Sequence, residues 1–186
     1  MNQDNSQAPM ILKERAYSFE DVTNTEEHAE LINGQLVIQN FTSVRHNHAV
    51  MEIASAIHAY IRAHHGSCRV FSENVGLYVD EGKNFFLPDV MVVCRPEIID
   101  DKGVHGAPDF VAEVTSESTR IRDFNEKLFS YRDLGVREYW VVDLQKQFIS
   151  VYLKENGFVP EPYIRPDRMK ISLFDLEIDT GSFWNS

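Results

Sequence analysis

Two strand-like apolar segments, each interrupted by a single acidic residue, constrain this sequence most strongly. Asp89 stands in the middle of Phe85–Val93, and Glu113 stands within Phe110–Thr115. Apolar segments of this length are typical of strands that are buried in a sheet. A buried ionised carboxylate is costly unless it is paired or binds a cation. The sequence therefore predicts a covered sheet whose interior holds two acids that need a partner.

Hydrophobic spacing and turn signals predict an α/β fold around these strands. Two apolar runs flank Asn33-Gly34, which is the strongest short signal for a β-hairpin. Apolar residues recur at helical spacing from Ser43 to His65 and over Thr119–Leu134, and a short helix capped by Ser18 is expected over Phe19–Ala29. Strands are predicted at residues 69–71, 75–79, 85–94, 110–115, 139–143 and 149–153, with one more near 171–174. We therefore expect helices that flank a mixed β-sheet.

The length of 186 residues fits one domain with short additions. We expect residues 1–16, rich in Asn, Gln and Ser, to form a disordered tail. Residues 17–155 are expected to form the domain that holds both acids, with residues 156–186 as a C-terminal extension packed on it. The chain has no apolar run long enough to cross a bilayer. Cys68 and Cys94 lack metal-ligand spacing, so we expect reduced thiols in a soluble cytoplasmic protein.

The formal net charge of -11 argues against a protein that coats nucleic acid through bulk electrostatics. It is compatible with an enzyme that concentrates carboxylates around a metal ion. Basic residues do occur on or just past the helix predicted over 119–134, at Arg120, Arg122, Lys127, Arg132 and Arg137. They form either a basic lip for a nucleic acid or a salt-bridged, solvated helix face. The absence of GxGxxG, GxSxG and CxxC motifs excludes most nucleotide-binding and serine-hydrolase classes.

Lys127 is the third candidate site residue. On a helical wheel it lies within the apolar arc formed by Phe124, Leu128, Tyr131 and Leu134, which is expected to face the sheet. There its ammonium group could orient or activate a water molecule and stabilise developing phosphate charge. The structural alternative is a lysine whose aliphatic stem covers the helix edge while its charge reaches solvent.

The two strand acids are candidate ligands for Mg²⁺ or Mn²⁺, hard cations that bind carboxylate oxygens and retain waters. Val111, Glu113 and Thr115 share one face of their strand because side chains alternate. Two alternatives stay open. Asp89 could cap a turn after Pro88, and Glu113 could lie at an exposed sheet edge.

Glu30 and His46 complete the candidate set. Glu30 stands where the first helix meets the hairpin, and an ordinary surface acid is its alternative. His46 begins the long helix on its apolar side and is a peripheral candidate, whereas His48 projects away. His58, His64 and His65 lack zinc-ligand spacing and are expected at the surface.

Several stretches together resemble the Uma-type putative restriction endonuclease family, a bacterial family within the PD-(D/E)XK nuclease superfamily. The similarity extends from about residue 18 to 155, and as a set it is specific. The matching stretches are Ala29–Gly34, Ser43 with His46, Leu87–Val90, Gly106–Val114, Asp123 with Lys127, Tyr131, Gly135-Val136 and Glu138–Asp143.

The resemblance implies a restriction-endonuclease-like sheet core flanked by helices, and Mg²⁺- or Mn²⁺-dependent hydrolysis of phosphodiester bonds. Asp89 and Glu113 would hold the ion, with the Val114 backbone carbonyl as a further ligand. Glu30 corresponds to the family's N-terminal acid, which binds metal or orients water. Thr115 stands where the wider superfamily has its lysine, and Lys127 takes that role here.

The leading hypothesis is a Mg²⁺-dependent DNA endonuclease that works as a homodimer, since cutting both strands requires two sites. The rival is a catalytically silent module that binds nucleic acid or protein on a nuclease scaffold, because fold does not fix function. A hydrolase of another phosphodiester, such as RNA, is the third hypothesis.

Overall fold

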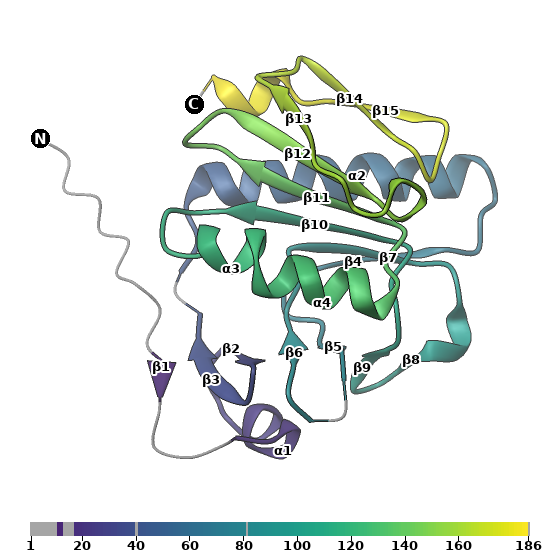
Figure 1. Ribbon diagram of the computed structural model, residues 1–186. Helices are drawn as coiled ribbons and strands as arrows, with labels where there is room; N and C mark the ends of the chain where they lie inside the picture. Colours follow the sequence, from purple (N-terminus) through teal and green to yellow (C-terminus); the bar gives the residue numbers. More distant parts are fainter. Residues whose placement is uncertain (1–10, 13–16, 40, 81, 186) are drawn as a thin grey trace, which may run out of the picture.

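A mixed six-stranded sheet forms the centre of the computed structural model, which describes residues 11–12, 17–39, 41–80 and 82–185. Its strand order is β13-β12-β11-β10-β7-β4 (Figure 1). Only β10 and β11 pair in parallel, and the other neighbours are antiparallel. The strands are β4 (Arg69–Ser72), β7 (Val90–Val93), β10 (Phe110–Thr115), β11 (Glu138–Asp143), β12 (Phe148–Leu153) and β13 (Glu161–Ile164). The predicted α/β fold with a mixed sheet is confirmed.

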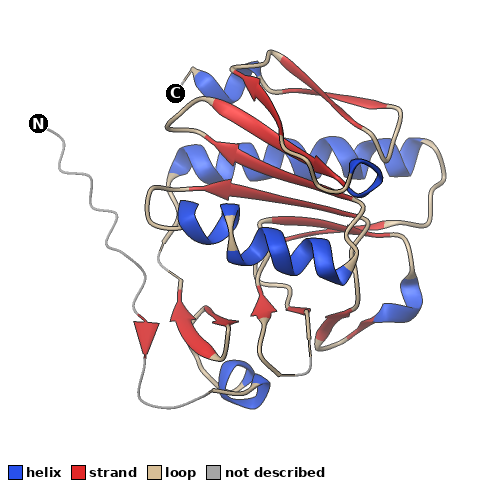
Figure 2. Ribbon diagram, viewed as in Figure 1, coloured by secondary structure: helices blue, strands red, loops and turns tan. Residues whose placement is uncertain are grey.

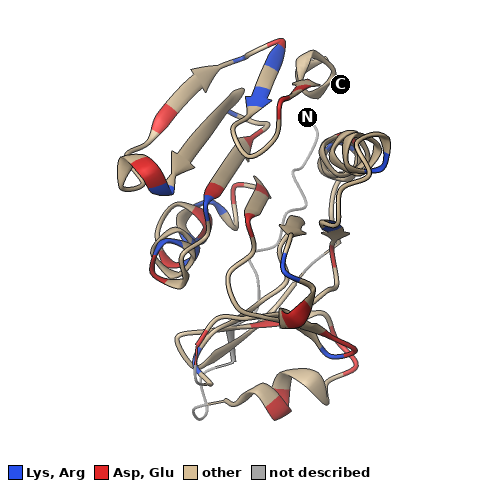
Figure 3. Cartoon of the chain, turned by 90° about the vertical axis from the view of Figure 1, so that its right-hand side faces the viewer, with Lys and Arg blue, Asp and Glu red and all other residues tan. Residues whose placement is uncertain are grey.

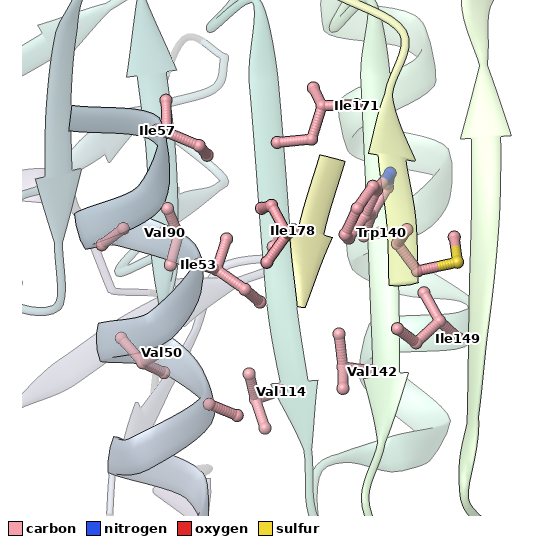
Figure 4. Packing of buried hydrophobic residues seen from close by; sticks show 14 of the residues in the cluster. Val50, Ile53, Ile57, Val90, Val114, Trp140, Val142, Ile149, Ile171 and Ile178 are labelled. Carbon is pink, nitrogen blue, oxygen red and sulfur yellow. The ribbon is translucent and has the colours of Figure 1, made fainter. Parts of the chain in front are cut away.

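Helices cover both faces of this sheet (Figures 1 and 2). On one face lies α2 (Val44–Ala63), whose apolar stripe includes Val50, Ile53 and Ile57. Figure 4 shows this stripe beside the sheet residues with which it shares a hydrophobic core, among them Val90, Val114, Trp140 and Val142. On the other face lie α3 (Arg120–Phe124) and α4 (Glu126–Leu134). With both faces covered, the central strands are buried at every position.

The C-terminal residues complete the core on the α2 side. The hairpin of β14 (Arg168–Ile171) and β15 (Leu176–Asp179) and the short 3-10 helix Gly181–Trp184 bury Ile171, Ile178 and Phe183 in it. The predicted strand near 171–174 is found earlier, as β14. The division of the chain at residue 155 stays a prediction.

A second sheet of short strands lies below the central one in Figure 1. Its order is β1-β3-β2-β6-β5-β9-β8, and α1 (Phe19–Thr23) contacts β2. The strands are β1 (Ile11–Leu12), β2 (Ala29–Ile32), β3 (Gln35–Ile38), β5 (Leu77–Tyr78), β6 (Phe85–Phe86), β8 (Ile99–Asp100) and β9 (Gly103–His105). The hairpin predicted at Asn33-Gly34 is confirmed as β2–β3.

The segment predicted as one strand over 85–94 is divided between the two sheets, so that prediction is wrong. It forms β6 in the second sheet and β7 in the central sheet. Between them lie Leu87, Pro88 and Asp89, and proline has no N–H with which to continue a strand ladder. Asp89 therefore lies where the chain passes from one sheet to the other.

Two helix predictions need correction. The helix expected over Thr119–Leu134 is two helices, because the backbone departs from helical geometry at Asn125 (φ -128°, ψ -81°). The helix expected over Phe19–Ala29 ends at Thr23, and Ala29 instead begins β2.

The prediction of two reduced thiols is also wrong, since Cys68 and Cys94 form a disulfide. The antiparallel register that pairs Arg69 with Val93, extended by one residue, places Cys68, just before β4, opposite Cys94, just after β7. Spacing along the chain cannot reveal this proximity.

At the N-terminus, Ile11 and Leu12 of the predicted tail pair with β3. Residues 1–10 and 13–16 lie outside the described residues. Among the helices of the described part of the chain, none is long and apolar enough to cross a membrane.

Candidate active site

Lys127 is the centre of a buried cluster of charges. Its Nζ lies 2.8 Å from Glu30 Oε1 and 2.9 Å from Glu113 Oε1. The Lys127 side chain is only 5% exposed, and the carboxylates of Glu30 and Glu113 are 0% and 4% exposed. These residues come from β2, β10 and α4, so the site lies where both sheets meet a helix. The alternative of a solvent-reaching lysine is excluded, and so are a surface Glu30 and an exposed-edge Glu113.

Further hydrogen bonds fix both carboxylates. Glu30 accepts from the backbone N–H of Leu87 over 2.9 Å and from the side-chain amide of Gln39. The Tyr131 hydroxyl donates to Glu113 Oε1 over 2.6 Å. A buried ion pair is stable only when such bonds satisfy the remaining polar atoms. The cluster is therefore held in one arrangement before anything binds to it.

Burial raises the pKa of Glu113 well above its usual range, although the positive charge of Lys127 opposes this. The neighbouring carboxylates of Asp89, Asp123 and Glu30 raise it further. Burial acts to lower the pKa of Lys127, but the attraction of Glu113, Glu30 and Asp123 outweighs it and raises the pKa above its usual value. Lys127 therefore remains a cation at neutral pH.

Asp89 lies beside this cluster in a more open position, with 17% of its side chain exposed. The antiparallel pairing of Val90 with Ala112, extended by one residue, sets Asp89 opposite Glu113. Its Oδ2 accepts the backbone N–H of Val114 over 2.7 Å, and its Oδ1 lies 3.2 Å from His46 Nε2. The acid is therefore anchored by the strand on which Glu113 stands, rather than serving only to cap a local turn.

His46 touches the site more directly than expected. In addition to its contact with Asp89, His46 Nε2 lies 3.9 Å from Glu73 Oε1. Burial acts to lower the pKa of His46, but attraction and hydrogen bonding from Asp89, with the charges of Glu73 and Asp123, raise it above the usual value. One ligand atom each from His46, Glu73 and Asp89 lie within 4.8 Å of one another, a spacing that could hold a metal ion.

Glu73 is not among the candidate residues expected from the sequence. It follows β4 directly, and the pairing of Ser72 with Val90 continues to place Glu73 beside Asp89. Its backbone is left-handed (φ 34°), as is that of Asn74 (φ 61°). Asn in a left-handed position is the one local signal, and it indicates a turn rather than a ligand.

Asp123 and Arg122 complete the surroundings of Lys127. Asp123 Oδ1 lies 3.9 Å from Lys127 Nζ, and burial raises the pKa of this acid while Lys127 and hydrogen bonds from Thr115 and Thr119 lower it. Arg122 Nη1 lies 3.9 Å from Glu30 Oε2, is buried, and has no hydrogen-bond partner among the described residues. This corner of the site therefore has an excess of carboxylates over cations.

The basic residues of α3 and α4 are paired with acids. Figure 3 shows basic and acidic positions mixed on these helices. Arg120 pairs with Asp143, Arg132 with Asp133, and Arg137 with Asp109, while Arg122 and Lys127 face Glu30. The arrangement matches the salt-bridged alternative better than a free basic lip.

Carboxylate oxygens fit a hard divalent cation, and Asp89, directly before β7, lies opposite Glu113 on the adjacent strand β10. Lys127 and Tyr131 both bind Oε1 of Glu113, so a cation would be held through its other oxygen, Oε2. Val114 donates its N–H to Asp89, and the role of its carbonyl oxygen as a ligand stays a prediction.

Comparison with known proteins places these residues in a family. The sequence profile of the Uma2 family, described as "Putative restriction endonuclease", matches residues 16–179. An "Uncharacterized protein sll1609" from Synechocystis is 28% identical over 120 residues, which is 63% of this chain and 67% of that protein. The crystal structure of a putative nuclease belonging to DUF820 from Anabaena variabilis matches with a TM-score of 0.72 at 20% identity. The match covers 86% of this chain and 91% of that one and shows a shared fold.

Proposed function

Because the chain belongs to the Uma2 family of putative restriction endonucleases, we propose that it is a Mg²⁺- or Mn²⁺-dependent endodeoxyribonuclease. It hydrolyses phosphodiester bonds of DNA in the cytoplasm and acts as a homodimer, since cutting both strands requires two sites. The observation that carries the proposal is that Asp89, directly before β7, lies opposite Glu113 on β10, next to a buried and charged Lys127.

Asp89 and Glu113 would hold the ion, with the Val114 carbonyl and Glu30 as candidate further ligands. A bound divalent ion supplies charge stabilisation of the phosphoryl group and a nucleophilic water at neutral pH. The Val114 N–H orients Asp89, and the Tyr131 hydroxyl orients Glu113. Partners of this kind fix ligand geometry and tune ligand basicity.

Lys127 contributes a fixed positive charge. Its contacts with Glu30 and Glu113 hold the ammonium group 2.8–2.9 Å from both carboxylates, so it needs no rearrangement when charge develops on the phosphoryl oxygens. Glu30 has a positioning role because it binds Lys127 and, through Leu87, the segment that leads to Asp89.

Nicking of a supercoiled plasmid by the full chain tests the proposal. We expect cutting with Mg²⁺ or Mn²⁺, none with EDTA, and none for Asp89→Ala. Asp175→Ala is the matched control, because the Asp175 side chain is 89% exposed on the C-terminal hairpin, and it should cut as the wild type does.

Retained cutting by Asp89→Ala would refute the assignment of the site. Failure of the wild type to cut any DNA or RNA substrate while still binding metal would favour the silent binding module. Two observations favour the silent binding module, namely the net charge of -11 and the pairing of the basic residues of α3 and α4 with acids.

A further inference from the structure

We propose that His46, Glu73 and Asp89 form a second cation site, which takes a divalent transition-metal ion such as Mn²⁺ in preference to Mg²⁺. Asp89 would then bridge this ion and the one held with Glu113. The bridging rests on the proposed function, whereas the three-residue site stands on its own geometry.

Three separate elements bring the ligand atoms together. His46 lies in the first turn of α2, where its backbone N–H donates to Ser43 Oγ over 3.1 Å. Glu73 follows β4, and its N–H donates to the carbonyl of Asp89 over 3.2 Å. Each side chain is therefore positioned by a backbone contact that does not involve its own ligand atom.

The distances suit one ion. His46 Nε2 lies 3.2 Å from Asp89 Oδ1 and 3.9 Å from Glu73 Oε1, and all three atoms lie within 4.8 Å. Two ligand atoms at about 2.1 Å from an octahedral ion are roughly 3.0 Å apart in neighbouring positions. An ion could therefore enter between the three atoms with movements of about 1 Å or less.

Access distinguishes this cluster from the one around Lys127. The side chains of His46, Asp89 and Glu73 are 14%, 17% and 32% exposed, whereas the Lys127 cluster is 0–5% exposed. An ion that keeps several waters needs an open side, and the Glu73 side provides it.

The ligand chemistry determines which ion is preferred. Imidazole nitrogen suits transition metals, while Mg²⁺ is bound through oxygen ligands. Glu113 and Asp89 offer oxygens alone, whereas the new site adds the His46 nitrogen. Because Asp89 has two oxygens, Oδ1 toward His46 and Oδ2 toward the Glu113 strand, it can serve both ions.

Mn²⁺ titration of the full chain, followed by electron paramagnetic resonance and calorimetry, tests the site. We expect two Mn²⁺ ions for each wild-type chain and a spin-coupled signal, because carboxylate-bridged ions lie about 4 Å apart. The variants His46→Gln and Glu73→Gln should each weaken the binding of one Mn²⁺ ion at least tenfold and abolish the spin coupling. Mg²⁺ should displace Mn²⁺ only from the other site, which is formed with Glu113.

Two matched controls are available on the exposed side of α2. His48→Gln and Glu52→Gln should bind Mn²⁺ as the wild type does, because both side chains are exposed. A second measurement needs no variant. Substoichiometric Mn²⁺ should broaden the imidazole resonances of His46 in the wild type far more than those of the exposed His64, which lies about 27 Å further along α2.

Unchanged Mn²⁺ binding in His46→Gln and Glu73→Gln, with sharp His46 resonances, would overturn the site and leave an imidazole–carboxylate ion pair. Binding of a single ion, lost in those variants but kept in Glu113→Gln, would support the site and overturn the bridge. The plasmid assay is independent of these results. If the wild type cuts no DNA while His46→Gln loses Mn²⁺ binding, the proposed function is refuted and this metal site is supported.

Discussion

Replacing Lys127 with Met tests whether its charge holds the site together. The substitution keeps an unbranched side chain of similar length and removes the ammonium group that lies 2.8 Å from Glu30 and 2.9 Å from Glu113. Hydrogen bonds from Leu87 and Tyr131 to these carboxylates remain. The variant therefore isolates the electrostatic contribution from the packing of α4.

The expected loss is large. Removing one partner of a buried ion pair costs about 3–5 kcal/mol, because it leaves an uncompensated charge. Here one cation serves two carboxylates that are less than 5% exposed. The loss has a limit, because a buried carboxyl group without its cation can take up a proton instead of staying charged. Raising the pKa of that group by one unit corresponds to about 1.4 kcal/mol. We expect about 3–5 kcal/mol at pH 7.5 and less in acid.

The pH dependence follows from the direction of the Glu113 pKa. Burial already raises it above the usual value, and Lys127 opposes that rise. Without Lys127 the pKa rises further, so the folded variant binds more protons than the unfolded chain between the usual pKa and the raised one. The free energy of unfolding then falls as pH rises through this window, by up to about 1.4 kcal/mol per pH unit for each proton.

Urea unfolding in EDTA between pH 5.5 and 8 measures this behaviour, with Lys146→Met as the matched control at an exposed position. In the double variant Glu30→Gln/Lys127→Met one of the uncompensated charges is gone, so part of the loss should be recovered. A Lys127→Met midpoint equal to the wild type at pH 7.5, or the same pH slope, would refute the electrostatic role.

Three further changes test the surrounding structure, each by urea unfolding. Tyr131→Phe removes the 2.6 Å hydrogen bond to Glu113 while keeping the ring against Phe86, and should cost about 1.5–3 kcal/mol, with a loss below about 0.5 kcal/mol contradicting the contact. Gly103→Ala places a Cβ 2.4 Å from the Gly76 carbonyl oxygen at φ 147° and should cost more than about 2 kcal/mol. Its control is Gly82→Ala, which is also at positive φ but in open space and should cost about 1 kcal/mol. Reduction of the Cys68–Cys94 disulfide, which joins residues 26 positions apart, should cost at most about 3.5 kcal/mol, and an unchanged midpoint would show that it does not restrain the unfolded chain.

Periodicity alone was enough to place Glu113 and Lys127. Alternation within a covered strand puts Glu113 on the face that α4 covers, and helical spacing turns Lys127 toward the same face. Glu30 joins them through the hairpin, whose Asn-Gly turn is a strong local signal. These features are local, so the sequence could predict them.

What depends on strand pairing could not be predicted. Glu73 reaches Asp89 only because β4 pairs with β7, and the same pairing brings Cys68 to Cys94. The split of the 85–94 segment depends on which sheet each half joins. Single-sequence patterns do not specify the neighbour of a strand, and here the neighbour decides which side chain lies beside Asp89.

Bound divalent cations would reconcile the negative charge of the site and of the whole chain with the binding of a phosphodiester. Among the described residues, the site holds the carboxylates of Glu30, Glu73, Asp89, Glu113 and Asp123 and two permanent cations, Arg122 and Lys127. The formal charge of this set with neutral His46 is therefore three negative units. The chain around it carries a formal charge of -11 and pairs the basic residues of α3 and α4 with acids. A phosphodiester therefore meets repulsion unless cations come from solution. Divalent ions held by these carboxylates would reverse the local charge where the phosphate must lie, and on the proposed function they serve for substrate approach as well as for hydrolysis.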